Sequence, residues 1–135
     1  MVIVITLGII LVVAIIIAVS LNSTLPANDW KTFTKNRLKE IDTETNFDDY
    51  VSMKSVLIDL DTLLDHALKN SGLSGQTMGE RLKSAHGLFE KEQYNDIWTA
   101  HKMRNQLVHE PTFKPSIAKL QASRNILKNA ILKLV

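Results

Sequence analysis

The chain has 135 residues, a formal net charge of +2 and no cysteine. The missing cysteines exclude disulfides, thiolate catalysis and cysteine-ligated zinc. The balanced charge excludes the basic surface that spreads over a whole nucleic-acid-binding domain, and a hydrophobic content of 45% excludes a disordered chain.

Residues 2–21 carry no charged side chain and consist mainly of valine, isoleucine and leucine. A helix of about 20 apolar residues spans the roughly 30 Å hydrocarbon core of a bilayer. A cleaved signal peptide is the alternative, but it needs a basic start and a shorter apolar run. No lysine or arginine precedes this run. We therefore expect residues 1–21 to be a retained transmembrane helix in contact with membrane lipid.

Positive charge follows the apolar run and does not precede it. The basic residues are Lys31, Lys35, Arg37 and Lys39. Because basic flanks stay in the cytoplasm, we expect a single-pass plasma-membrane protein with a cytoplasmic C-terminal domain. Residues 22–45 are predicted to be a juxtamembrane linker and a short basic helix. Trp30 on that helix suits either the lipid headgroups or packing onto the domain.

The rest of the chain shows helical periodicity and no sustained alternation of apolar and polar residues. The clearest amphipathic segment is 47–70, with Asn46 as its predicted N-cap and Ser71-Gly72 as its stop. Thr77 and Glu80 form a capping-box pattern that opens a helix through Phe89.

Two further helices complete the prediction. One runs from Asn95 or Asp96 to about His109, where Pro111 disfavours helical geometry at the preceding residue. The last follows Pro115. The fold class is therefore all-α, an antiparallel bundle of four to five helices over residues 46–135 behind one N-terminal transmembrane helix.

Arg104 stands in the middle of the predicted apolar face of its helix. At 100° per residue this face contains Ile97, Ala100, His101, Arg104, Leu107 and Val108. Burial of an unpaired guanidinium is costly, so Arg104 needs either a partner or a polar cleft. A buried carboxylate such as Asp61 or Asp65 is one partner, and an anion in a cleft is the other.

His109 lies five residues after Arg104, where the helix is expected to end. On a continuing helix the two side chains would point about 140° apart, but at a fraying end the imidazole can turn back. An arginine and a histidine that converge can bind a phosphate and move a proton. His109 can equally close the helix through its dipole. His101, one turn before Arg104, is expected to be a half-buried neighbour and not a third member of the cleft.

The segment Arg104-Asn105-x-x-x-His109 resembles the signature of HEPN domains, an arginine and a histidine separated by four to six residues of which the first is polar. The helical pattern over residues 49–135 agrees with that resemblance. The anchored layout is similar to bacterial membrane-anchored proteins that carry a HEPN-like domain.

The resemblance implies two different functions. One is a metal-independent endoribonuclease in which two copies line one cleft. His109 would then move the 2′-hydroxyl proton, Arg104 would hold the scissile phosphate and Asn105 would orient the pair. The other is a non-catalytic interaction or scaffold module, since many family members cleave nothing. The nuclease requires a homodimer and implies RNA as a partner. In the module, Arg104 and His109 would hold the bundle or its dimer together, and we expect a homodimer.

Metal and cofactor chemistry finds no support in the sequence. Asp59, Asp61 and Asp65 point around their helix and are expected to form a solvated acidic face. The four histidines include no i,i+4 pair, and no phosphate-binding glycine loop is present. We expect no metal and no cofactor.

Overall fold

The computed structural model describes residues 29–135, and all of its regular elements are helices. They are α2 (Asp29–Glu44), α3 (Tyr50–Asn70), α4 (Met78–Ser84), α5 (Lys91–His109) and α6 (Ile117–Leu134). The predicted all-α bundle is confirmed for this part of the chain. The predicted transmembrane helix, residues 1–21, lies outside the described residues. Within residues 29–135, no helix has the length and apolar content required to cross a bilayer.

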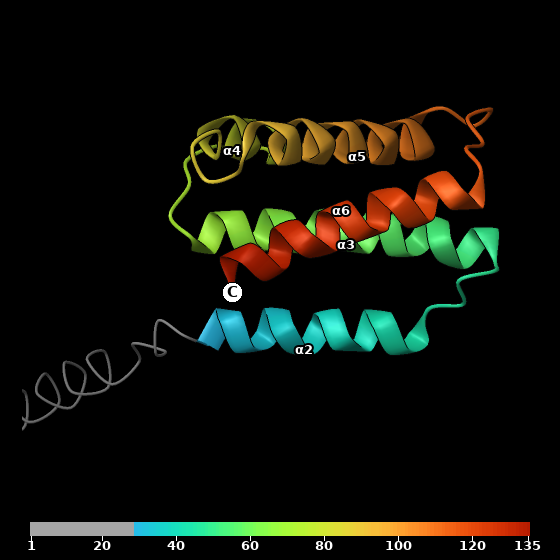
Figure 1. The fold of residues 1–135 in the computed structure, drawn as a ribbon, viewed down its shortest axis with the longest axis horizontal. Helices are drawn as coiled ribbons and strands as arrows, with labels where there is room; N and C mark the ends of the chain where they lie inside the picture. Colours follow the sequence, from blue (N-terminus) through green and yellow to red (C-terminus); the bar gives the residue numbers. More distant parts are fainter. Residues whose placement is uncertain (1–28) are drawn as a thin grey trace, which may run out of the picture.

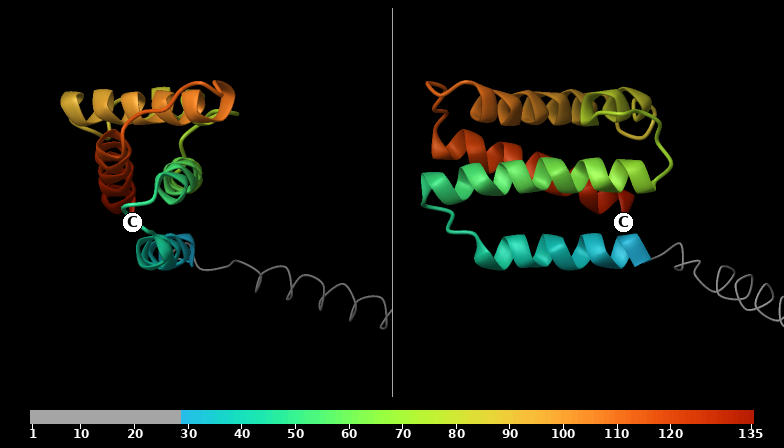
Figure 2. Two further views of the ribbon diagram at one scale, coloured as in Figure 1. Left: turned by 90° about the vertical axis from the view of Figure 1, so that its right-hand side faces the viewer. Right: turned by 180° about the vertical axis from the view of Figure 1, so that it is seen from behind.

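The helices form three layers. Figure 1 shows α4 and α5 on one side, α3 and α6 crossing in the middle, and α2 on the other side. Figure 2 shows the same order from the end of the bundle. α2 and α3 run in opposite directions, as do α5 and α6, whereas the central pair, α3 and α6, run the same way (Figure 1). The start of α2 and the C-terminus consequently lie at the same end.

The core lies mainly between α3 and α6, with α5 covering them. Fully buried side chains on α3 recur at helical spacing, and the largest are Met53, Leu57, Leu60, Leu64 and Leu68. Leu120, Leu127 and Ile131 meet them from α6, and Ile97 from α5. α2 contributes less, burying only Thr34, Leu38 and Ile41. α3 therefore contacts each of the other described helices, although α5 packs more closely on α6 than on α3.

Helix ends follow the sequence signals where a side chain supplies the cap. The Thr77 hydroxyl accepts a hydrogen bond from the Glu80 amide at 3.3 Å, as the capping-box pattern predicts. Ser116 caps α6 in the same way. Gly72 has φ +84°, the left-handed conformation expected after α3. The predicted N-cap of α3 was wrong, because Asp49 and not Asn46 holds that position.

Two helix boundaries differ from prediction. α5 begins at Lys91, several residues before Asn95, and its N-cap Glu90 makes no side-chain capping bond. α4 ends at Ser84, short of Phe89, although the Phe89 side chain is still buried. Within residues 22–45 the structure describes one helix, α2, which carries four basic and four acidic residues.

Candidate functional site

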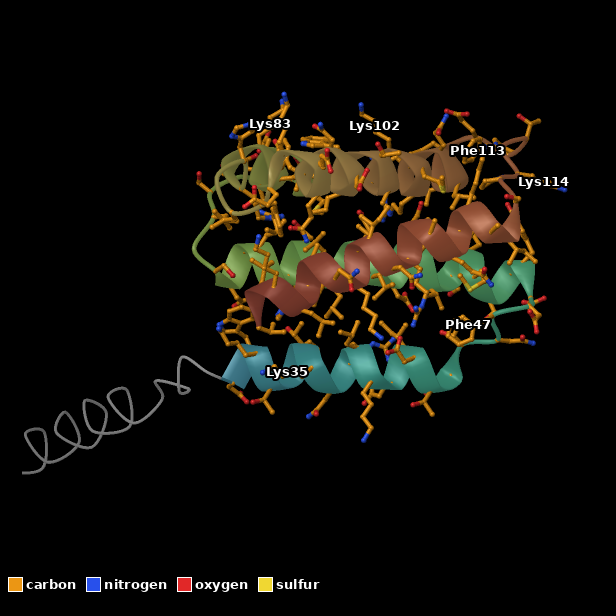
Figure 3. All side chains as sticks on the ribbon, viewed as in Figure 1. Lys35, Phe47, Lys83, Lys102, Phe113 and Lys114 are labelled. Carbon is orange, nitrogen blue, oxygen red and sulfur yellow. The ribbon has the colours of Figure 1, made fainter. Side chains whose placement is uncertain are left out.

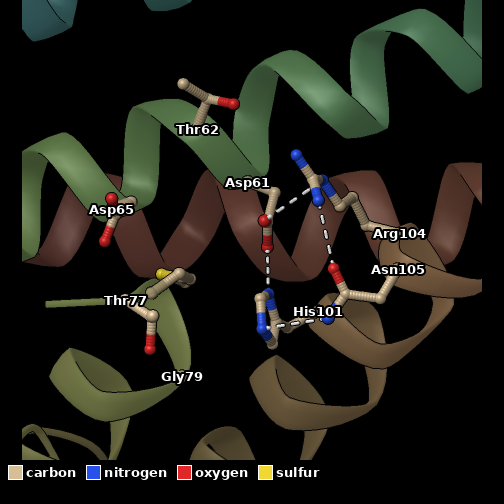
Figure 4. A pocket seen from close by; sticks show the side chains of 9 residues that line it. Asp61, Thr62, Asp65, Thr77, Gly79, His101, Arg104 and Asn105 are labelled. Atoms are coloured by element: carbon tan, nitrogen blue, oxygen red, sulfur yellow. Dashed lines mark hydrogen bonds and ion pairs between the residues drawn. The ribbon is translucent and has the colours of Figure 1, made fainter. Parts of the chain in front are cut away.

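A polar cavity of about 400 Å³ opens between α3, α4 and α5. Figure 4 shows Asp61 and Arg104 side by side in its lining, joined by an ion pair. The lining residues come from α3 (Asp61, Thr62, Asp65), from the start of α4 (Thr77, Met78, Gly79) and from α5 (His101, Arg104, Asn105). This cavity unites the most polar buried side chains of α3 and α5, so it is the candidate site.

Asp61 is the deepest charge in the cavity, with an exposed fraction of 3% for the whole residue. Its Oδ1 lies 2.8 Å from His101 Nδ1, and its Oδ2 lies 3.5 Å from Arg104 Nε. The second contact is an ion pair without a hydrogen bond. A buried carboxylate needs partners of this kind, because burial without them costs several kcal/mol.

Asn105 links the same two partners from the other side. Arg104 Nη1 donates to Asn105 Oδ1 at 3.1 Å, and Asn105 Nδ2 lies 3.2 Å from His101 Nε2. Since a guanidinium only donates, the Asn105 oxygen must face Arg104 and its NH₂ group must face His101. His101 Nε2 then accepts, so the imidazole carries its proton on Nδ1 and donates it to Asp61. The four side chains form a closed ring, drawn as dashed lines in Figure 4.

Arg81 fixes α4 at the edge of the cavity. Its Nε donates to Asp65 Oδ1 at 2.6 Å and its Nη2 to Asp65 Oδ2 at 2.9 Å, and Nη1 donates to the Gly75 carbonyl. The hydrogen bond with Asp65 raises the pKa of Arg81 above its usual range. Gly75 has φ +145°, and a Cβ there would lie 2.6 Å from the Arg81 amide nitrogen, so only glycine fits this turn.

α4 lies against α5 at Gly79, where a Cβ would make ordinary van der Waals contacts. A Cβ at this position would lie 3.6 Å from Trp98 Cη2 and 4.0 Å from His101 Nε2. Trp98 in turn packs edge-on against the His101 ring, with ring centroids 5.9 Å apart. The imidazole is therefore held by Asp61 and Asn105 in its plane and by Trp98 beside it.

The structure brings two of the three predicted site residues together. Arg104 and Asn105 line the cavity, whereas His109 is the last residue of α5, is exposed, and does not line it. Within residues 29–135, no hydrogen bond or ion pair joins His109 to Arg104. The histidine beside Arg104 is His101, one turn earlier, which sequence reasoning placed outside the cleft. Its i,i+3 spacing from Arg104 was the available signal.

The acidic residues of α3 divide into three environments. Asp59 is half-buried, with a side chain 45% exposed, and lies 3.7 Å from Arg37. Asp61 is buried and Asp65 is paired with Arg81, so the predicted solvated face was wrong for both. Asp61 is instead the carboxylate partner named as one alternative for Arg104. Among residues 29–135, no three His, Cys, Asp or Glu side chains group as metal ligands do.

The cavity offers few free groups for chemistry. Asp61 Oδ1 and both ring nitrogens of His101 are already engaged with one another or with Asn105. The Arg104 side chain is 25% exposed, and its Nη2 makes no hydrogen bond within the described residues. The arrangement therefore holds Arg104 in place and leaves one edge of its guanidinium open to an anion.

Acid should weaken the attachment of α4 through Glu80. Its carboxylate accepts a 2.7 Å hydrogen bond from the Gln76 amide, and this bond lowers the pKa of Glu80 below the usual 4.5. The ionised form therefore stabilises the fold. That stability is complete above the unfolded-state pKa and is lost as the pH falls through the folded-state pKa. We predict that Glu80→Gln lowers the urea midpoint at pH 7, and that its difference from wild type shrinks below about pH 4.

Glu92→Gln is the matched control, because Glu92 lies in the first turn of α5 without a hydrogen bond to the described backbone. The urea midpoint of Glu92→Gln should stay close to that of wild type both at pH 7 and below about pH 4. A Glu80→Gln difference that stays constant from pH 7 to pH 3 would contradict this account.

Comparison with protein-family models, with curated proteins and with solved structures finds no match to this chain. The geometry of the cavity and the sequence pattern are thus the basis for assigning a function.

Proposed function

We propose that this chain is a non-catalytic interaction module with a HEPN-like fold. In this proposal, residues 1–21 hold it at the plasma membrane with the helical bundle in the cytoplasm, and two copies pair as a homodimer. The resemblance in Arg104-Asn105-x-x-x-His109 and the all-helical bundle both support the fold assignment.

The contacts of Arg104 within one copy of the chain support a non-catalytic function. Its guanidinium faces the buried Asp61 carboxylate and donates to Asn105 within the same copy. A guanidinium poised for a scissile phosphate would instead keep its donors free for the phosphate oxygens. His109 lies outside the cavity, so one copy does not assemble an Arg–His pair. The motif in this reading stabilises the packing of α5 on α3.

A second function, a metal-independent endoribonuclease, has one observation in its favour. His109 is exposed, and a quarter of the Arg104 side chain is exposed. A second copy could therefore reach both residues and complete a composite site from two incomplete ones. His109 would then act as the base and Arg104 would hold the phosphate.

RNA cleavage separates the two functions. We predict that the full-length chain in detergent micelles with EDTA leaves no 2′,3′-cyclic phosphate ends on total RNA. Arg104→Ala should lower the free energy of unfolding by about 2 kcal/mol, because Asp61 loses a charged partner. Lys102→Ala is the control on the same helix, since Lys102 points away from the bundle (Figure 3) and should change stability by less than about 0.5 kcal/mol.

The nuclease reading makes the opposite prediction. Cleavage by the wild-type chain that is lost in His109→Ala, while Arg104→Ala unfolds at the wild-type temperature, would replace the module with the enzyme.

Orientation in the membrane is tested separately. Because Lys31, Lys35, Arg37 and Lys39 follow the predicted anchor, we expect a tag on the C-terminus to survive protease added to intact bacterial spheroplasts. Lysis of the spheroplasts should then expose the tag to cleavage. A tag that is cut before lysis would place the bundle on the other side of the membrane.

A further inference from the structure

The ring in the cavity has a fixed hydrogen-bond direction. Arg104 donates to Asn105, Asn105 donates to His101, and His101 donates to Asp61. The orientation of the Asn105 amide therefore couples His101 to Arg104, because its oxygen accepts from Arg104 and its NH₂ group donates to His101. Only the neutral imidazole can accept from the Asn105 NH₂ group.

We propose that His101 is a proton-responsive switch that holds Arg104 through Asn105 when neutral and releases it when protonated. This switch goes beyond the proposed function and would operate in the interaction module and in the endoribonuclease alike. It rests on the contacts in the cavity and on the rule that an imidazolium only donates.

Protonation of His101 changes Nε2 from a hydrogen-bond acceptor into a donor. Nε2 then carries a hydrogen and faces the Asn105 NH₂ group at 3.2 Å, so two donors oppose each other. Rotation of the Asn105 amide by 180° restores that contact by bringing Oδ1 to His101. The same rotation turns the NH₂ group toward Arg104 Nη1, where it opposes a donor that cannot be removed. The bond between Asn105 and Arg104 is lost in the rotated arrangement. Rotation is favoured because the His101 side chain is only 10% exposed, whereas the Arg104 side chain is 25% exposed and can turn its freed donor to solvent.

Charged groups of both signs lie around His101. From α3, Asp61 favours the imidazolium, while Asp65 is neutralised by the bidentate Arg81 of α4. From α5, Arg104 favours the neutral ring, and Trp98 contributes an uncharged edge. The backbone of α4 nearest the ring is Gly79, which brings no charge.

Release would change what the cavity offers to a ligand. Arg104 would keep its ion pair with Asp61, but Nη1 would join Nη2 as a free donor toward the cavity. The guanidinium would then present two adjacent donors, the arrangement that binds a carboxylate or phosphate through two oxygens.

Nuclear magnetic resonance of the full-length chain in detergent micelles tests the switch. Between pH 8 and pH 5, the ring nitrogens of His101 and the side-chain amide of Asn105 should shift with one midpoint. The coupling across the Asn105–His101 hydrogen bond should be present above that midpoint and absent below it. The order parameter of the Arg104 guanidinium should fall over the same pH range.

Asn105→Asp is the matched variant, because a carboxylate accepts from the imidazolium and from Arg104 at once. Arg104 should stay ordered at every pH in that variant. Asn105→Ala provides a second variant, in which Arg104 should be as mobile at pH 8 as at pH 5. The wild-type titration decides the proposal if neither variant folds. A His101 that does not titrate between pH 5 and pH 8, or an Asn105 amide that does not follow it, would overturn the switch.

Discussion

Burial of the Asp61 carboxylate is the constraint on which the site depends. A charge only 3% exposed on the central helix cannot remain unpaired, so α5 must present both His101 and Arg104 to it. These two residues lie one turn apart, which fixes the rotation of α5 about its own axis. The apolar contacts of α5 stabilise its packing but are not directional. The contacts of His101 and Arg104 with Asp61 are directional, so they fix how α5 is turned against α3.

The bundle was predictable because most of its signals are local. Thr77 with Glu80 and the stop at Gly72 act over one helical turn, and the apolar spacing of α3 is periodic. The start of α5 was not predictable, because Glu90 makes no side-chain capping bond. Packing of Ile97 and its neighbours extends that helix toward its N-terminus without a local signal.

The site was predictable only in part. The place of Arg104 on an apolar face of α5 required a partner, and a carboxylate of α3 was one of the alternatives. The sequence could not select Asp61 over Asp65, since the two lie one turn apart on α3 and only packing decides which of them meets Arg104. The motif spacing drew attention to His109, whereas helical spacing brings His101 beside Arg104. Long-range pairing of this kind depends on the tertiary contacts and not on the local pattern.

A double-mutant cycle between Asp61 and Arg104 tests the central claim most directly. Asp61→Asn, Arg104→Gln and the double variant would be compared with wild type in urea unfolding of the full-length chain. If Asp61 depends on Arg104, the effects are non-additive, with a coupling free energy of about 1–3 kcal/mol. Additive effects within about 0.3 kcal/mol would contradict the account and leave Arg104 free for a ligand.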